Sequence, residues 1–298
     1  MKIDLVGPSY QAWSSPFNAE RTVNLFPVLD TRGKEVAALY GTPGLTLLDT
    51  AGAGAIRNCF AAQNGRAFVV SGSTLYEIDS LGVPTSRGSL NQSSGNVSIA
   101  ENGFQLAICD GTTVYIFTYA TNAFASPVTP GYVTAASITF LDSYFIVNKV
   151  DTGEMYISAQ YDGLTTAESS PDDLIRVYNA VGQLWLLGSH TSEIWTNTGA
   201  SAFPFQKISG ANLEIGIVAP QTAVAIQEAL VWVGEDQFGT GGVYKTTGIR
   251  PEKISTEPIE TLIQNAPNKD KITAYAYQQQ GHSFYVLTGG GLETTFYN

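Results

Sequence analysis

The chain has 298 residues, 44% of them hydrophobic, and its 30 glycines and 13 prolines supply many turns, so it can bury a substantial core. Its apolar stretches are far shorter than the roughly 20 residues that a transmembrane helix requires, which argues against a membrane protein. Its 15 basic and 26 acidic residues give a formal charge of −11 without a Lys/Arg cluster, which disfavours tight DNA binding but suits a surface past which DNA slides.

Residues 1–50 form the first section of the chain and do not follow the pattern of the rest. The N-terminus has no apolar segment of the signal-peptide kind, so we expect synthesis in a cytoplasm. Tyr10, Trp13 and Phe17 are flanked by small polar residues, which suits either a subunit interface or packing onto the chain's own fold. Two short strands are predicted around the turn at 42–44.

A short β-rich unit recurs about six times from residue 54 to the C-terminus. Each unit has an alternating strand, a turn, a continuous apolar strand, a second turn and a third strand. The central apolar strands lie near Phe68, Leu106, Phe145, Trp185, Val231 and Phe284. Their separations of 38, 39, 40, 46 and 53 residues are typical of the blades of a β-propeller. Blades pack face to face around an axis and bury both faces of their central strands, which explains the apolar runs.

Asn-Gly at 64–65 and 102–103 and Asp-Gly at 110–111 are strong hairpin signals within these units. We therefore predict an all-β fold, a β-propeller of six blades made of short antiparallel sheets, or of seven if the first fifty residues form an irregular blade. A large β-sandwich or β-solenoid is the alternative. The predicted domains are an N-terminal arm at 1–50 and a propeller at 51–298.

A propeller has to close its ring, and an N-terminal strand can complete the last blade. We predict that a strand within residues 36–48 pairs with the sheet of residues 272–298. The rival interpretation is that residues of a longer protein, beyond this sequence, complete the ring.

The cysteines and histidines do not indicate a metal site. Cys59 and Cys109 lie in predicted strands, where free thiols act as small hydrophobes, and His190 and His282 lie in a turn and at the start of a strand. Two cysteines and two histidines do not make the usual zinc spacings. We predict no metal ligands and no cofactor.

Candidate catalytic groups are few. The carboxylate pairs Asp172/Asp173 and Glu235/Asp236 could serve glycosidic acid–base chemistry, but solvated loops are the favoured interpretation. The glycine-rich stretch at 234–242 lacks the Lys and Ser/Thr of a phosphate-binding loop and is predicted to be a hairpin loop. We therefore predict no catalytic residue and no enzymatic activity.

Three segments of the second half have expected structural roles. Trp195 is predicted to pack between blades, with a role at a subunit interface as the alternative. The segment at 213–220 is predicted to link two blades, with Gly216 allowing a tight turn and Pro220 ending a strand. A short helix is predicted at 258–265 from its apolar stripe.

Seven segments follow one another in an order that is similar to a known family. They are ERTVNLFPV at 20–28, GTPGL at 41–45, SEIWTNTG at 192–199, FPFQKISGANLEIGIVAP at 203–220, VWVGEDQFGTGGVYK at 231–245, PEKISTEPIETLI at 251–263 and AYAYQQQGHSFYVLT at 274–288. Together they resemble the packaged-DNA stabilisation proteins of short-tailed bacteriophages, also described as tail accessory or tail hub proteins. Members of this family run beyond this C-terminus, which leaves any distal domain open.

The resemblance implies a structural role in the virion. Members assemble as a homohexameric ring beneath the portal and its adaptor ring, help to retain the packaged DNA, and give tail fibres, tailspikes or a needle a place to attach. It implies partners among these proteins, DNA nearby without specific binding, and no membrane. The alternative from another class is a propeller-type glycan-binding module or glycosidase, for which an axial pocket lined by converging carboxylates would be diagnostic. A generic intracellular propeller scaffold is a third possibility.

Overall fold

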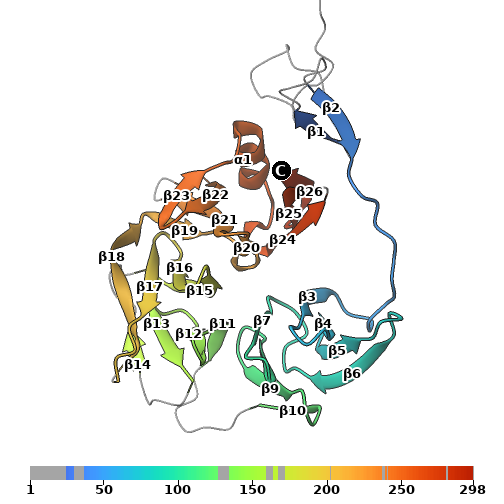
Figure 1. Cartoon of the computed structure of the whole chain (residues 1–298), viewed down its shortest axis with the longest axis vertical. Coiled ribbons are helices and arrows are strands. Elements are labelled where there is room, and N and C mark those ends of the chain that lie inside the picture. The colour runs from blue at the N-terminus through green and yellow to red at the C-terminus, as the bar shows by residue number, and fades with distance from the viewer. Residues whose placement is uncertain are drawn as a thin grey trace, which may run out of the picture.

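The computed structural model describes residues 25–29, 37–126, 134–158, 164–166, 172–201, 203–236, 239, 241–279 and 281–297. In these residues the chain is built mainly of antiparallel strands (Figure 1). Consecutive strands form six sheets, which we number I to VI in chain order, and a separate two-stranded hairpin precedes them.

Sheets I to III contain four strands each. Sheet I consists of β3 (Ile56–Ala61), β4 (Ala67–Ser71), β5 (Thr74–Ile78) and β6 (Pro84–Ser89). Sheet II consists of β7 (Ser98–Glu101), β8 (Gln105–Cys109), β9 (Val114–Thr118) and β10 (Ala123–Ala125). Sheet III consists of β11 (Ala135–Leu141), β12 (Tyr144–Lys149), β13 (Glu154–Ile157) and β14 (Leu164–Thr166).

Sheets IV to VI differ in their number of strands. Sheet IV consists of β15 (Leu174–Ala180), β16 (Gln183–Gly188), β17 (Ser192–Asn197) and β18 (Phe205–Leu213). Sheet V consists of β19 (Ile215–Ile217), β20 (Val224–Ile226), β21 (Ala229–Asp236), β22 (Gly241–Thr247) and β23 (Arg250–Lys253). Sheet VI consists of β24 (Ile272–Gln279), β25 (His282–Gly289) and β26 (Leu292–Tyr297). The helices are η1 (Pro220–Thr222), α1 (Glu257–Gln264) and η2 (Lys269–Lys271).

The sheets follow one another around an arc, as in a β-propeller, with the first strand of sheets I to IV and VI, and β20 of sheet V, toward the centre (Figure 1). The six predicted central strands are β4, β8, β12, β16, β21 and β25, so the predicted fold class is confirmed. Gly65 and Gly103 each have a φ of 85° in the turns that follow β3 and β7, the left-handed conformation that the Asn-Gly signals predicted.

Sheets I to V each have an outermost strand beyond the three predicted for each unit, so that prediction was wrong for them, and sheet V also has β19 at its inner edge. The outermost strands are β6, β10, β14, β18 and β23. The outer strand of a sheet is exposed and needs neither an apolar run nor strict alternation. The sequence of β6, PTSRGS, is polar and only partly buried, and this explains why the pattern did not reveal it.

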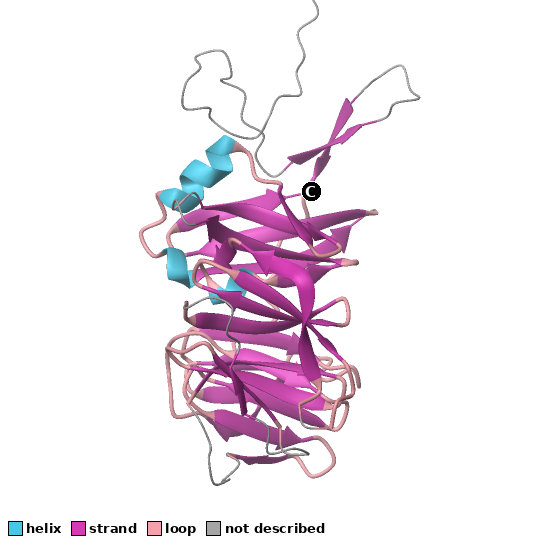
Figure 2. Ribbon diagram, turned by 90° about the vertical axis from the view of Figure 1, so that its left-hand side faces the viewer, coloured by secondary structure: helices cyan, strands magenta, loops and turns pink. Residues whose placement is uncertain are grey.

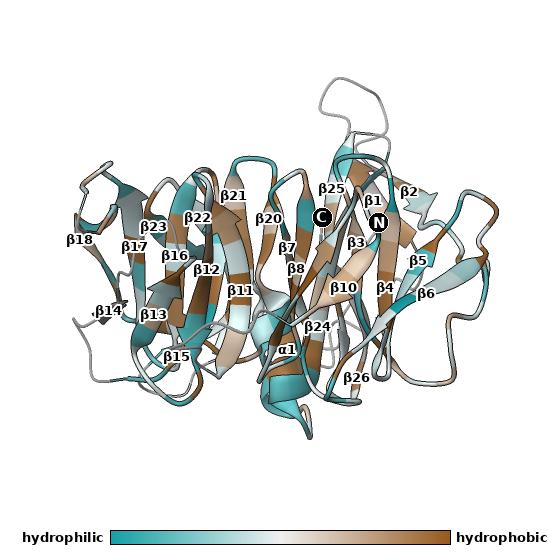
Figure 3. Ribbon diagram, turned by 90° about the horizontal axis from the view of Figure 1, so that it is seen from below, coloured by the Kyte–Doolittle hydropathy of each residue, from teal (hydrophilic) through white to brown (hydrophobic). Residues whose placement is uncertain are grey.

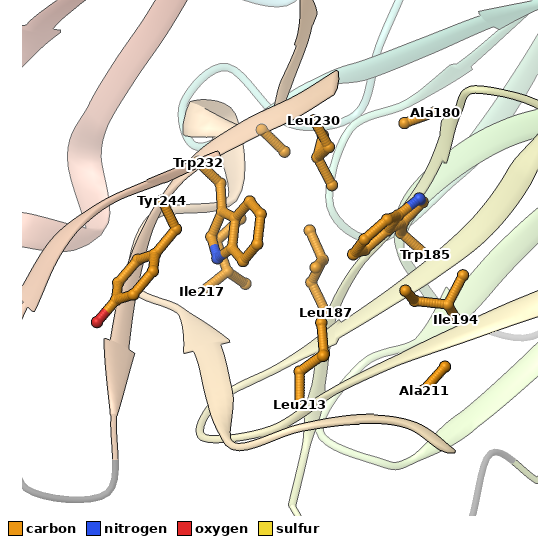
Figure 4. Packing of buried hydrophobic residues seen from close by; sticks show 11 residues of the cluster. Ala180, Trp185, Leu187, Ile194, Ala211, Leu213, Ile217, Leu230, Trp232 and Tyr244 are labelled. Atoms are coloured by element: carbon orange, nitrogen blue, oxygen red, sulfur yellow. The ribbon is translucent and has the colours of Figure 1, made fainter. Parts of the chain in front are cut away.

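Five apolar cores join consecutive sheets, from I–II to V–VI. Figure 4 shows the core between sheets IV and V, where the ring centroids of Trp185 and Trp232 are 6.1 Å apart. Trp195 is buried in the core between sheets III and IV, which confirms its predicted packing role. Figure 3 shows apolar residues along the strands and hydrophilic ones concentrated at the turns.

The helices lie toward one face of the molecule (Figure 2). Helix α1 falls within one residue of its predicted range, and Ile263 on its inner side is 1% exposed in the core between sheets V and VI. Leu262, which was expected on the same apolar stripe, is instead 46% exposed.

Sheets I and VI form the two ends of the arc, and no core of the described residues joins them. Near this opening, β1 (Leu25–Leu29) pairs with β2 (Ala37–Gly41), and this hairpin packs on sheet VI through Phe26. The predicted pairing of a strand from residues 36–48 with residues 272–298 was therefore wrong. The strand exists as β2, but its backbone bonds are made with β1, so the hairpin meets sheet VI with side chains instead of a strand edge.

Candidate functional site at the axis of the sheets

The inner strands are tied to one another by side chains that recur about one repeat apart. The Ser98 hydroxyl of β7 accepts a hydrogen bond from Ile138 N of β11 at 2.9 Å. The Ser137 hydroxyl of β11 accepts one from Val177 N of β15 at 3.0 Å. Both bonds join residues 40 positions apart, so each one fixes a sheet to the next sheet at the axis.

Asparagine amides make a second set of such bonds. They are Asn58 Nδ2 to Val97 O at 2.7 Å, Asn148 Nδ2 to Leu174 O at 2.5 Å, and Asn179 Nδ2 to Phe140 O at 2.8 Å. Each donates to a backbone carbonyl in, or just before, a strand of the neighbouring sheet. Because buried polar groups are costly when unpaired, these bonds fix the spacing of the inner strands.

A pocket of about 430 Å³ opens among these inner strands. Its walls come from sheets II, III and IV and from η1. They are formed by Gln92, Ser94, Gly95, Asn96, Ser98, Asp110, Gly111, Thr112, Ala136, Ser137, Val150, Asp151, Asp173, Leu174, Ile175, Arg176, Pro220 and Gln221. This volume lies in the range of small-molecule sites.

Helix η1 lies between β19 and β20 of sheet V and contributes Pro220 and Gln221 to the wall of this pocket. Gln221 Nε2 donates to Val97 O, just before β7, at 2.8 Å. The helix is held in place by Thr222, whose carbonyl accepts a bond from the Tyr285 hydroxyl at 2.7 Å and whose hydroxyl accepts one from Val233 N at 3.1 Å. Sheets II, V and VI are thus linked through one short helix.

Arg176 lies in β15 at the wall of the pocket and is 9% exposed. Its Nη1 donates to the carbonyl of Pro220 and to Gln221 Oε1, and its guanidinium lies 5.0 Å from the centroid of the Tyr178 ring. Its Nε is buried and has no hydrogen-bond partner in the described part of the chain. Burial lowers the pKa of Arg176, since it disfavours the charged form.

A second arginine organises the loop at one side of the pocket. Arg57 of β3 donates to the carbonyls of Gly72, Gln92, Ser94, Gly95 and Asp110 at 2.7 to 3.4 Å. Burial lowers the pKa of Arg57, and the nearby Asp110 opposes this effect. The guanidinium therefore acts as a centre around which the loop before β7 is folded.

Asp110 is the carboxylate of the pocket with the most clearly defined contacts. Its oxygens accept bonds from Thr112 Oγ1 at 2.8 Å, Thr113 N at 2.8 Å, Gln92 N at 3.2 Å and the Tyr115 hydroxyl at 3.2 Å. Burial would raise its pKa, but these hydrogen bonds outweigh it and lower the pKa of Asp110. The group stays charged at neutral pH, which suits a structural role better than that of a proton donor.

The two predicted carboxylate pairs, Asp172/Asp173 and Glu235/Asp236, do not share a site. Asp172 closes the turn after β16, accepting from His190 N, Thr191 N and Thr191 Oγ1 at 2.9 Å each. Asp173 lines the axial pocket, whereas Glu235 and Asp236 end β21 at the hairpin of sheet V and do not line it. The structure therefore does not bring the two pairs together.

The cysteines and histidines also lie apart. Cys59 is exposed on β3, and Cys109 is buried on β8, with its thiol donating to Ala135 O at 3.1 Å. His190 is in the turn after β16, and His282 begins β25. Within the described ranges, no three His, Cys, Asp or Glu side chains are grouped as metal ligands.

The segment at 213–220 joins sheets IV and V, as predicted, and Pro220 begins η1 after β19 has ended. The role of Gly216 was predicted wrongly. It lies within β19, not in a turn, and a Cβ there would approach the Ser189 carbonyl to 2.3 Å, so glycine is required by the close approach of two backbones. Tyr10, Trp13 and Phe17 lie outside the described residues.

Sequence analysis missed Arg57, Arg176 and Gln221, because they come together only through the tertiary fold. One signal was available for the bonds beside them. Ser98 and Ser137 occupy equivalent positions of the repeat, 39 residues apart, and a polar residue recurring at one position of an otherwise apolar strand indicates a repeated hydrogen bond.

Comparison with known proteins finds one family and a shared fold. The phage stabilisation family model, described as bacteriophage P22 Gp10, beta-propeller, matches residues 1–290. No curated protein sequence matches. Among solved structures, the extracellular domain of a one component system from B. thetaiotaomicron aligns at a TM-score of 0.54 with 13% identity, over 93% of this chain and 38% of that chain. This likeness shows the fold alone.

The tricorn protease aligns at a TM-score of 0.44 with 14% identity, over 82% of this chain and 25% of its own. The chain thus spans well under half the length of the solved structures that it resembles. None of the helices in the described ranges is long and apolar enough to cross a membrane.

Proposed function

Because the chain belongs to the phage stabilisation family of β-propeller proteins represented by bacteriophage P22 Gp10, we propose that it is a structural protein of the virion, located in the tail or neck. It is made in the cytoplasm of the bacterial host and acts without catalysis. The single observation that carries this proposal is the family match over residues 1–290, which includes the hairpin, sheets I to V and the first two strands of sheet VI.

In this proposal six copies form a ring-shaped hub below the portal and its adaptor. The hub retains the packaged DNA and anchors a spike, fibre or needle. The formal charge of −11 supports a role beside DNA, since an acidic surface repels the phosphate backbone and does not hold it. The side-chain bonds that join neighbouring sheets at the axis support a mechanical role.

The test is co-sedimentation of the purified chain with a portal-plus-adaptor assembly from its own phage, with the stoichiometry determined by mass. We expect six copies per twelve-fold portal vertex. Circular dichroism of the same sample establishes that the chain is folded, and a portal without its adaptor serves as the control for binding below the adaptor ring. A folded chain that does not sediment with the complete assembly contradicts the hub.

The axial pocket supports a second candidate, a glycan-binding module or glycosidase. Asp110, Asp151 and Asp173 line this pocket, and carboxylates around an axial cavity are what such a function requires. The low pKa of Asp110 argues against its use as a general acid. A glycan screen followed by Asp173→Asn tests this candidate: loss of a measured binding or turnover supports it, and an unchanged signal or a screen without any binder rejects it.

A further inference from the structure

The hairpin of β1 and β2 is joined to the sheets by a long segment, residues 42–55, without helix or strand. It runs along the open side of the arc from β2 to β3 (Figure 1). At about 3.3 Å per residue these 14 residues can span roughly 46 Å. Leu45, Leu47 and Leu48 within it are 94, 81 and 73% exposed, so three large apolar side chains of this segment are left in water.

The hairpin sits on sheet VI through a small group of side chains. Phe26 is 5% exposed, and its ring centroid lies 5.0 Å from that of Phe284 and 5.4 Å from that of His282. Val286 and Tyr277 complete this group, which we call the seat. The seat lies on the face of sheet VI that is turned away from sheet V, and it holds the hairpin by aromatic and aliphatic packing.

Sheet I also has an apolar face that no other sheet of the described residues covers. Cys59, Ala61 and Ala67 are exposed on it, and Val69 and Tyr76 on the same face are half-buried. None of the five belongs to the apolar cores of the described residues. The two ends of the arc therefore differ, because the outer face of sheet VI is covered by the hairpin and that of sheet I is open.

We propose that the hairpin is exchanged between copies of this chain, so that Phe26 of one copy occupies the seat of the next. Every copy carries both the hairpin and the seat, so exchange keeps each contact seen here and requires no new complementary surface. The length of residues 42–55 allows the hairpin to reach a neighbour. Its leucines and the open face of sheet I then lie at the junction of two copies and leave the solvent.

Exchange in one direction, from each copy to the next, produces a ring when the rotation closes. The inference thus deepens the proposed function and rests on its self-association, but not on portal binding. It assigns the hairpin as the element that holds neighbours together.

The experiment uses cysteine cross-linking. Tyr40 and His282 flank Phe26, with ring centroids 6.1 and 5.4 Å from it, so Tyr40→Cys and His282→Cys place two thiols at the seat and leave Phe26 and Phe284 intact. Cys59→Ser removes the exposed native thiol, and the buried Cys109 is retained. The two single variants carry different tags, are co-expressed as full chains, and are treated with a short bismaleimide.

A covalent dimer that carries both tags is expected, since each single variant holds only one of the two thiols. The double variant is expected to give a ladder that ends at the size of the ring. Cross-linking confined to single chains of the double variant overturns the exchange, and so does the absence of any cross-link. Gln206→Cys, exposed on β18 on the far side of the arc, replaces His282→Cys as the control for chance encounters.

Native mass spectrometry of the same samples separates this inference from the proposed function. Rings of six that contain only cross-links within single chains overturn the exchange and leave the hub intact. A protein that remains monomeric at every concentration overturns both the exchange and the self-association of the hub, whereas portal binding is measured independently by co-sedimentation.

Discussion

Replacing Asn148 by alanine should destabilise the protein more than the small loss of volume suggests. Asn148 is fully buried in β12, where its Nδ2 donates to Leu174 O at 2.5 Å and its Oδ1 accepts from the Ser137 hydroxyl at 2.6 Å. Its removal leaves the Leu174 carbonyl without this donor and the Ser137 O–H without its acceptor, although the Ser137 oxygen still accepts from Val177 N. An unsatisfied buried polar group costs about 1–3 kcal/mol, so the free energy of unfolding should fall by about 2–6 kcal/mol.

Urea unfolding followed by tryptophan fluorescence and circular dichroism measures this loss, provided that the slope of the transition is unchanged. Asn91→Ala, at an exposed position before β7, is the matched control and should cost less than about 0.5 kcal/mol. Because Ser137 and Asn148 share one bond, Ser137→Ala and Asn148→Ala together should cost less than the sum of the two. A loss for Asn148→Ala no greater than the control, or strict additivity, would refute the reasoning.

Two further predictions concern titration and thiol chemistry. A hydrogen bond from Arg66 and the charge of Arg87 lower the pKa of Glu77, so its stabilising effect is fully present above the ordinary value of 4.5 and is lost as the pH falls through the lower folded value. Unfolding free energies measured between pH 3 and 7 should therefore depend less on pH in Glu77→Gln, and equal slopes in both proteins would contradict this. Burial raises the pKa of Cys109 to about 12, whereas Cys59 is exposed. Ellman's reagent should therefore modify one thiol of the native monomer and two thiols of the denatured protein. Modification of two thiols in the native state would contradict the burial of Cys109.

The central strands of sheets II to V were predictable because each is buried between two neighbouring sheets, and this requires a continuous apolar run such as QLAIC in β8. The outer strands were not, because a strand such as β6 faces water and carries no pattern. The helix at α1 was found from its apolar stripe, although Leu262 turned out to be exposed.

The main error was the predicted pairing of a strand from residues 36–48 with the last sheet. It arose because β2 pairs with β1, its neighbour in the sequence. A strand predicted from composition alone does not reveal its partner. The partner of β2 is β1, with Leu29 paired to Ala37 and Leu25 to Gly41, and closing so short a loop costs little entropy. The axial site could not be predicted from the sequence for a similar reason. Arg176, Gln221 and Val97 are far apart in the sequence, and Gln221 contacts both others only because the tertiary fold places η1 at the pocket.

The bond from Gln221 to Val97 has a mechanical consequence for an arc whose ends are not packed together. In such an arc, small changes in the tilt between neighbouring sheets add up and widen the opening between sheets I and VI. This bond joins residues 124 positions apart and connects sheet II directly to sheet V. Sheets II to V thus form a closed frame, in which the bond limits the distance between sheets II and V. Sheet VI is attached to the same frame by the bond from the Tyr285 hydroxyl to Thr222 O, and sheet I by the bonds from Arg57 and Asn58 to the segment before β7, so we expect side-chain bonds at the axis to resist widening of the arc.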